Sequence, residues 1–140
     1  MTIWKTTLNI QELNRLCQNC AVSHLGIEFV RFGENWLEAT LQVDQRTTQP
    51  FGLLHGGVSA VMAETLGSAA SLLCCESNQI AVGKELNIRH LKAVKQGVVT
   101  AKAQPINLNT DEHIWEITQY NEKNEPFSIA TLVVKIITKA

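Results

Sequence analysis

An apolar segment from about residue 56 to residue 75 constrains the fold more than any other part of the chain. It is long enough for five turns of helix, and Glu64 is its only charged residue. A helix that is apolar on every side belongs either in the core of a soluble protein or in a membrane. A lone carboxylate in such a helix is costly to bury unless it has a task or a partner.

The membrane alternative is the weaker of the two. The segment also contains serine, threonine and glycine, and it lacks flanking aromatic residues or lysines. A carboxylate at the centre of a membrane helix costs about 2.5–3.5 kcal/mol on insertion scales. We therefore expect the helix to lie in a soluble core, where other elements cover most of its surface.

The remaining sequence patterns predict the elements that cover this helix. Asn9 and Glu12 have the spacing of a capping box and predict a short helix over about 9–18. Alternating or apolar runs bounded by turn residues predict strands at 24–32, 36–43, 80–91, 97–108, 112–121 and 127–137. Short links between the last strands favour antiparallel neighbours. The predicted class is α+β, a single domain over 1–140 in which a curved antiparallel sheet wraps one central helix.

The composition of the chain argues against several classes of function. Twelve basic and thirteen acidic residues give a net charge of −1, and no dense basic run predicts a nucleic-acid partner. The first ten residues contain no apolar stretch of signal length, which predicts a cytoplasmic protein. Cys17 and Cys20 have the spacing of a metal or redox pair, but Cys74 and Cys75 are adjacent and complete no zinc pattern. We expect four reduced cysteines that mostly serve packing.

Residues at the start of the long helix could carry chemistry. Free N–H groups at a helix start stabilise developing negative charge, and His55-Gly56-Gly57 opens this helix. Glu64 and Ser68 are four residues apart and share a helix face, while Gln49 lies in the preceding loop. A donor for a carbonyl oxygen, a carboxylate and a group that holds water are what thioester hydrolysis requires.

Each of these residues also has a simpler explanation. A serine inside a helix often bonds back to the carbonyl four residues earlier, here that of Glu64. A histidine at a helix start can merely accept a backbone hydrogen bond, and two glycines can merely permit close packing. Glu64 is the exception, because its predicted burial needs a reason.

The stretch QPFGLLHGGVSAVMAETLGS, residues 49–68, closely resembles the hotdog-fold acyl-CoA thioesterases of the PaaI-like group. Within that group it looks most like the branch of the enterobactin proofreading and 1,4-dihydroxy-2-naphthoyl-CoA thioesterases. The similarity extends to IWK at 3–5, AVSHLGIEF at 21–29, WLEATLQV at 36–43, VGKELNIRHLKAV at 82–94, PINLN at 105–109 and Trp115. An HGG triplet alone is weak evidence for this resemblance, but the longer motif Q-P-F-G-x-L-H-G-G followed by A-E-x-x-G-S is specific to it.

The resemblance implies a role for each catalytic candidate. Glu64 would be the catalytic carboxylate, acting as nucleophile or as general base. The Gly56 N–H, helped by His55, would polarise the thioester carbonyl. Gln49 would orient the carbonyl side or the leaving group, and Ser68 would position water.

The resemblance also implies substrate contacts. His90 would line the acyl pocket, and Val82 and Gly83 would border the pantetheine arm. Thr110 stands where relatives carry an arginine near the nucleotide end, so the coenzyme A phosphates need another partner here. No metal and no organic cofactor would be needed, since coenzyme A arrives as part of the substrate.

Sequence reasoning thus predicts a hydrolase that acts on acyl-CoA, with aromatic acyl groups expected first. A homodimer with shared sites is expected, because His55 and Glu64 are about 13 Å apart along one helix, and the resemblance favours a dimer of dimers. Two alternatives remain: a hotdog enoyl-thioester hydratase, against which the absence of an aspartate in the helix argues, and a module that binds acyl-CoA without turnover.

Overall fold

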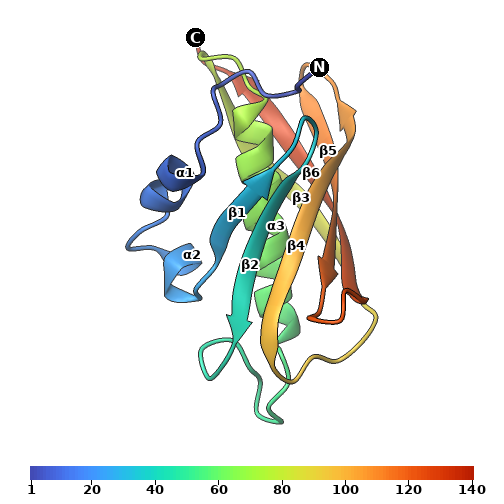
Figure 1. The fold of residues 1–140 in the computed structure, drawn as a ribbon. Coiled ribbons are helices and arrows are strands. Elements are labelled where there is room, and N and C mark those ends of the chain that lie inside the picture. The colour runs from blue at the N-terminus through green and yellow to red at the C-terminus, as the bar shows by residue number, and fades with distance from the viewer.

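The computed structural model describes residues 1–140 and consists of three helices and six strands (Figure 1). The helices are α1 (Ile10–Leu16), α2 (Ala21–His24) and α3 (Gly56–Leu73). The strands are β1 (Glu28–Phe32), β2 (Leu37–Val43), β3 (Gln79–His90), β4 (Gly97–Leu108), β5 (Glu112–Tyr120) and β6 (Pro126–Thr138). All neighbouring strands are antiparallel, in the order β1-β2-β4-β5-β6-β3. The predicted α+β class, with a curved sheet around one helix, is confirmed.

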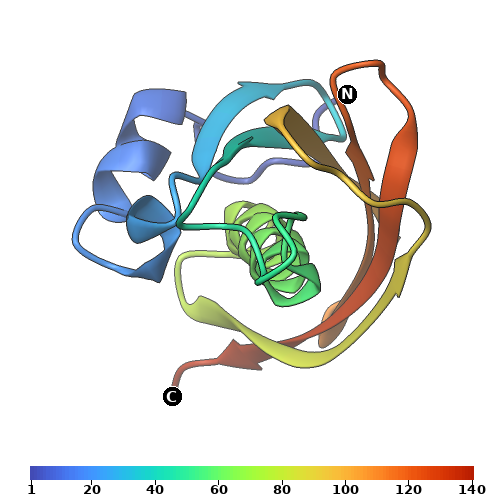
Figure 2. The same ribbon diagram turned by 90° about the horizontal axis from the view of Figure 1, so that it is seen from below.

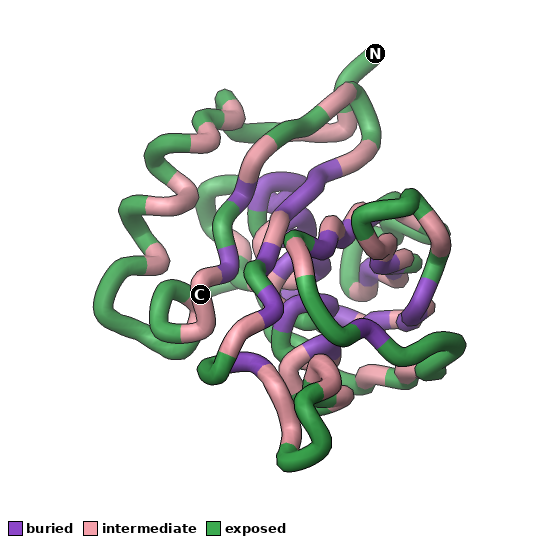
Figure 3. The backbone as a smooth tube through the Cα atoms, turned by 60° about the horizontal axis from the view of Figure 1, so that its bottom comes forward, coloured by how far each residue is buried: buried purple, intermediate pink, exposed green.

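The sheet curves around α3, as the view along the helix shows (Figure 2). Its concave face presents apolar side chains, many of them on β2, β4 and β5, to the helix. Alanines at 39, 101 and 103 and Gly67 on α3 keep helix and sheet close; a Cβ at Gly67 would lie 2.6 Å from Leu132. Buried residues gather around the helix, while the loops and most of α1 are exposed (Figure 3).

The cover over α3 is incomplete. The expectation that the helix is buried on most sides is wrong for one face, where Val61, Glu64 and Leu72 are exposed. This face is left open because β1 and β3, the two edges of the sheet, do not meet. No helix of the protein is long and apolar enough to cross a membrane.

The two edges of the sheet differ. Beside β1, the side-chain amide of Asn14 on α1 donates to the Phe29 carbonyl at 2.9 Å and accepts from the Phe29 N–H at 2.8 Å. Asn14 thus takes the place of a neighbouring strand at this point. Strand β3 pairs with β6 on one side only, and most of its twelve residues are exposed.

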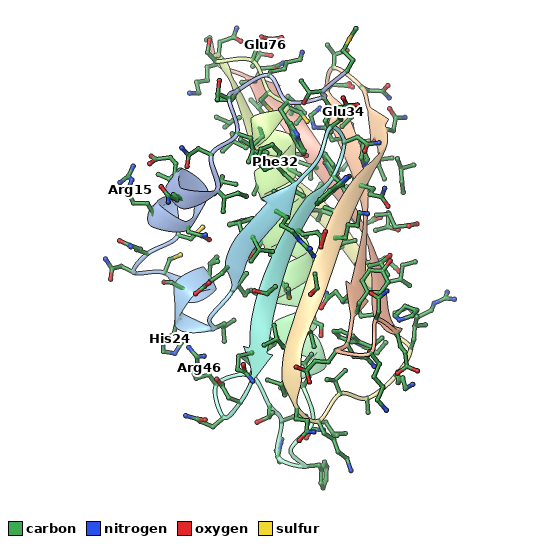
Figure 4. All side chains as sticks on the ribbon, in the orientation of Figure 1. Arg15, His24, Phe32, Glu34, Arg46 and Glu76 are labelled. Atoms are coloured by element: carbon green, nitrogen blue, oxygen red, sulfur yellow. The ribbon has the colours of Figure 1, made fainter.

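Three local details refine the sequence prediction. Asn9 caps α1 as expected, accepting from the Glu12 N–H at 3.0 Å. The strand predicted at 24–32 is wrong at its start, because α2 and a left-handed turn at Gly26 (φ +78°) precede β1. Arg46 explains that turn: its guanidinium packs where a Cβ of Gly26 would lie and donates to the His24 carbonyl (Figure 4).

The cysteines are free, and Cys74 and Cys75 belong to the hydrophobic core, as predicted, whereas Cys20 is exposed. Burial raises the pKa of the Cys74 thiol to about 12. Cys74 is therefore a thiol rather than a thiolate near neutral pH, which suits packing and not nucleophilic chemistry.

A buried hydrogen-bond network fixes the C-terminal half of α3 to the sheet. Ser71 accepts a hydrogen bond from the Trp115 indole N–H at 2.5 Å and lies 3.1 Å from His113 Nδ1. Since the Ser71 oxygen accepts from the indole, its own proton is free to go to His113. Burial, and then the charge of Lys5, lowers the pKa of His113, so this imidazole is neutral near pH 7.

Replacing Ser71 tests this network. Ser71→Ala leaves the Trp115 indole N–H buried without an acceptor, which costs about 1–3 kcal/mol. We expect the melting temperature to fall by a few degrees, measured by calorimetry. Ser77→Ala, at an exposed serine, is the matched control and should leave it unchanged. A Ser71→Ala protein that melts with the parent would show that the network adds nothing to stability.

Candidate active site

The start of α3 holds two hydrogen-bond donors whose direction is fixed. His55 is the N-cap, and its Nδ1 accepts from the Gly57 N–H at 2.8 Å. An Nδ1 that accepts must be unprotonated, so neutral His55 carries its proton on Nε2. The Gly56 N–H lies before the first helical hydrogen bond and donates to no group of the chain. The simpler reading of His55 as a helix-terminal hydrogen-bonding group is confirmed, and it leaves Nε2–H as a donor.

The loop before α3 is held by Gln49. Its Oε1 accepts from the N–H groups of Phe51, at 2.6 Å, and Leu53, at 3.3 Å. The His55 N–H donates to the Thr47 carbonyl at 2.9 Å, which ties the start of α3 to the beginning of the loop. Because Oε1 is occupied, the amide Nε2 of Gln49 is the part of this side chain left to act on a ligand.

Gln49 and Gly56 border a cavity of about 430 Å³ at the N-terminal end of α3, the lower end in Figure 1, whereas His55 is exposed and is not part of its wall. His90, at the end of β3, lies against the helix start, and a Cβ on Gly56 would be 2.8 Å from His90 Nε2. A Cβ on Gly57 would be 2.9 Å from the ring of His55. The two glycines therefore let two imidazoles pack against the helix start, which confirms that they permit close packing.

Glu64 and Ser68 lie on the open face of α3. With Ala60, Val61, Thr65 and Leu86 they line a shallow depression of about 450 Å³. A Cβ on Gly83 would be 2.7 Å from Glu64 Oε2, so this glycine of β3 leaves room for the carboxylate. The Ser68 hydroxyl makes no bond back to the Glu64 carbonyl and remains available on this face.

The predicted burial of Glu64 is wrong for a single chain, where this carboxylate is exposed. The cause is geometric: a lone charge in an apolar helix signals burial only if all faces of the helix are covered, and this face is not. Because the Glu64 carboxylate is exposed in a single chain, it does not carry the free-energy cost of burial that the sequence analysis expected.

The structure sorts the predicted residues into two groups. Gln49, His55, Gly56 and His90 come together at the start of α3. Glu64, Ser68 and Gly83 come together about two turns further on, and Val82 is 45% exposed beside them on β3. Within one chain, the structure does not join the two groups.

Sequence reasoning missed part of the first cavity. Its wall includes Ser59, Lys92 and Phe127. Ser59 could have been found from its place one turn into the helix, but Phe127 comes from another strand, and only the fold brings it here. Thr110 lies at the opposite end of α3, in the turn from β4 to β5, beside Lys5 and His113.

The chain belongs to the thioesterase superfamily, whose family model matches residues 51–127. It is 48% identical over 121 residues to the proofreading thioesterase EntH of Cronobacter turicensis, covering 86% of this chain and 88% of that one.

Solved thioesterases share the whole fold. One from Haemophilus influenzae is 49% identical with a TM-score of 0.96, over 98% of this chain and 96% of that one. A mutant thioesterase from Pseudomonas aeruginosa, with a glutamine changed to alanine, is 40% identical with a TM-score of 0.96, over 98% and 99%. The protein is a thioester hydrolase of hotdog fold.

The contact between Gly83 and Glu64 can be tested. In Gly83→Ala the new methyl group would lie 2.7 Å from Glu64 Oε2, so the carboxylate must move, while the backbone φ suits alanine. We expect thioesterase kcat to fall by about tenfold or more with an unchanged melting temperature, since small displacements of a reacting group are costly.

The neighbouring Lys84→Ala is the control and should leave kcat near that of the parent. Full activity of Gly83→Ala would mean that the carboxylate does not need the position it holds here.

Proposed function

We propose that this protein hydrolyses acyl-CoA thioesters to a free acid and coenzyme A, with aromatic acyl groups preferred. The observation that carries the proposal is the pair of oriented donors at the start of α3, the free Gly56 N–H and the His55 Nε2–H. Two such donors suit a thioester carbonyl that gains negative charge in the transition state. The EntH similarity supports a proofreading type of substrate, and the choice of acyl-CoA and of an aromatic group is part of the proposal.

Each proposed catalytic role uses a hydrogen-bonding atom of the residue that has no partner within the chain. The carbonyl oxygen accepts from Gly56 N–H and His55 Nε2–H, and the amide Nε2 of Gln49 contacts the carbonyl side or the leaving sulfur. The Glu64 carboxylate either attacks the carbonyl carbon or removes a proton from water held by Ser68. His90 borders the acyl group, and Val82 and Gly83 border the pantetheine arm. Water is the only other reactant, and no metal or organic cofactor takes part.

The two groups of residues must meet for this reaction to occur. His55 and Glu64 are about 13 Å apart along α3, whereas a donor and a carboxylate must both reach one carbonyl group. A second copy of the chain, related by a two-fold axis, would place its Glu64 and Ser68 beside the first copy's His55, Gly56 and Gln49. Two equivalent sites result from one such contact.

The exposed surfaces support this assembly. The open face of α3 carries Val61 and Leu72, and the unpaired edge of β3 carries Ile80 and Val82, each of them at least 36% exposed. A second copy that covers this face and edge would bury Glu64 as well, in the environment that the apolar helix predicts. We extend the proposal to a homodimer with shared sites, two of which form a tetramer.

A thiol-release assay over a panel of acyl-CoA substrates tests the chemistry. The parent should release coenzyme A from benzoyl-type substrates faster than from short aliphatic ones. Glu64→Gln and Glu64→Ala should lose about 10²–10⁴ in rate and keep the parental melting temperature. Glu116→Gln, at an exposed carboxylate on β5, is the matched control.

Near-normal turnover of Glu64→Ala would remove Glu64 from the mechanism. Hydration of an enoyl-CoA without thiol release would favour a hydratase, and binding without either reaction would favour a non-catalytic module.

Mixed dimers test the shared site. His55→Ala and Glu64→Ala chains, each inactive alone, are co-expressed with different tags and the mixed dimer is purified. One of its two sites carries both changes and the other carries neither, so about half of the parental activity should return. Mixed dimers with no activity would show that His55 and Glu64 do not serve one site from different chains.

A further inference from the structure

Thr47 is the only buried residue between Val43, at the end of β2, and Ser59, in the first turn of α3. Its exposed fraction is 0%, while the other residues between them are half-buried or exposed. A buried hydroxyl costs stability relative to a methyl group unless it forms hydrogen bonds. The contacts of the Thr47 hydroxyl must therefore explain why this position holds a threonine and not a valine.

The Thr47 hydroxyl closes a turn at the end of β2. It accepts from the Asp44 N–H at 2.9 Å and donates to the Gln42 carbonyl at 3.0 Å. The Thr47 N–H donates to the Asp44 carbonyl at 3.0 Å. The hydroxyl thus acts as donor and as acceptor, and these hydrogen bonds fix Thr47 relative to the strand.

The backbone of the same residue holds the start of α3. The Thr47 carbonyl accepts from the His55 N–H at 2.9 Å. An isolated antiparallel bridge between Thr48 and Leu54 lies beside this hydrogen bond, so the loop returns to the point where it left β2. His55 and Gly56 carry the two proposed donors to the substrate carbonyl. The Thr47 carbonyl therefore sets where these donors lie relative to the sheet.

Other contacts hold the loop without the hydroxyl. The Leu54 N–H donates to the Val94 carbonyl at 2.8 Å, and the Gln49 N–H donates to the Leu53 carbonyl at 2.8 Å. Neither hydrogen bond involves Thr47. Loss of the hydroxyl should therefore leave the loop folded and loosen only the point at which it joins β2.

We propose that Thr47 is a positioning residue for the thioesterase reaction. Its hydroxyl fixes the turn after β2, and its carbonyl holds His55 and, through it, Gly56 at the place where they donate to the substrate. Thr47 is not part of the wall of the 430 Å³ cavity, so it acts only through these residues. The inference rests on the proposed function, because it needs the two donors to act on the substrate carbonyl.

Two replacements separate the hydroxyl from the rest of the side chain. Thr47→Val keeps the shape and removes the hydroxyl, whereas Thr47→Ser keeps the hydroxyl and removes a buried methyl group. We expect Thr47→Val to lower kcat about tenfold with little change in KM, since a small displacement of a reacting group is costly. Thr47→Ser should keep the parental kcat. Both variants should melt below the parent, so a purely structural role would lower kcat in both.

Ser71→Ala is the matched control. It lowers the melting temperature through a hydrogen-bond network in the C-terminal half of α3, and it should leave kcat unchanged. Thr47→Ala, which also lacks the hydroxyl, takes the place of Thr47→Val if the valine variant does not fold. All variants are assayed as the full chain with the best substrate of the acyl-CoA panel.

Hydrogen exchange followed by NMR gives a second readout, at the hydrogen bond itself. In Thr47→Val the His55 amide should exchange about tenfold faster than in the parent, because its local opening becomes easier. The Leu54 amide, which is bonded to the Val94 carbonyl, should keep its rate. In Thr47→Ser both amides should exchange at parental rates.

The outcomes separate this inference from the proposed function. Parental kcat in Thr47→Val, an equal loss of kcat in Thr47→Ser, or unchanged exchange of the His55 amide would overturn the positioning role. If His55→Ala keeps full activity, the donor role of His55 fails, and the role of Thr47 fails with it. An inactive His55→Ala beside a fully active Thr47→Val leaves the proposed function standing and rejects the role of Thr47 alone.

Discussion

The cover that the sheet gives to α3 is the constraint on which the rest of the structure depends. A helix of eighteen residues with so few polar groups needs apolar neighbours, and a six-stranded sheet supplies them by curving around it. The curve stops before the circle closes, which leaves one face of α3 open and one edge of the sheet unpaired. The candidate catalytic residues lie there and at the start of the helix, where the end of β3 and the loop before α3 come together.

Much of this could be predicted from the sequence, because apolar periodicity and turn residues are local signals. The ranges of β2, β4, β5 and β6 agree with the predicted ones within one or two residues. The missed helix at Ala21–His24 has no such signal, since its four residues form a single turn whose end contacts Arg46, twenty-two residues after His24. The exposure of Glu64 could not be predicted either, because it depends on what covers the helix and not on the helix itself.

In the candidate site, too, some features could be predicted from the sequence and others depend on the fold. The motif around His55 predicted the residues at the start of α3, and the structure adds which nitrogen of His55 is free and which end of Gln49 is occupied. These details follow from hydrogen bonds to Gly57, Phe51 and Leu53, which only a folded loop can make.

Asn14 has a consequence for how copies of this chain can associate. A sheet with two open edges can add strands at both, and such addition has no natural end. Here one edge is occupied at Phe29 by a side chain of the same molecule, whereas β3 pairs with β6 on one side only and leaves its other side open. In the proposed dimer, two copies that pair through β3 would each use the other's open edge, and the combined sheet would end in two β1 strands. The amide of Asn14 thus makes the β1 edge a poorer template for a further strand than the β3 edge.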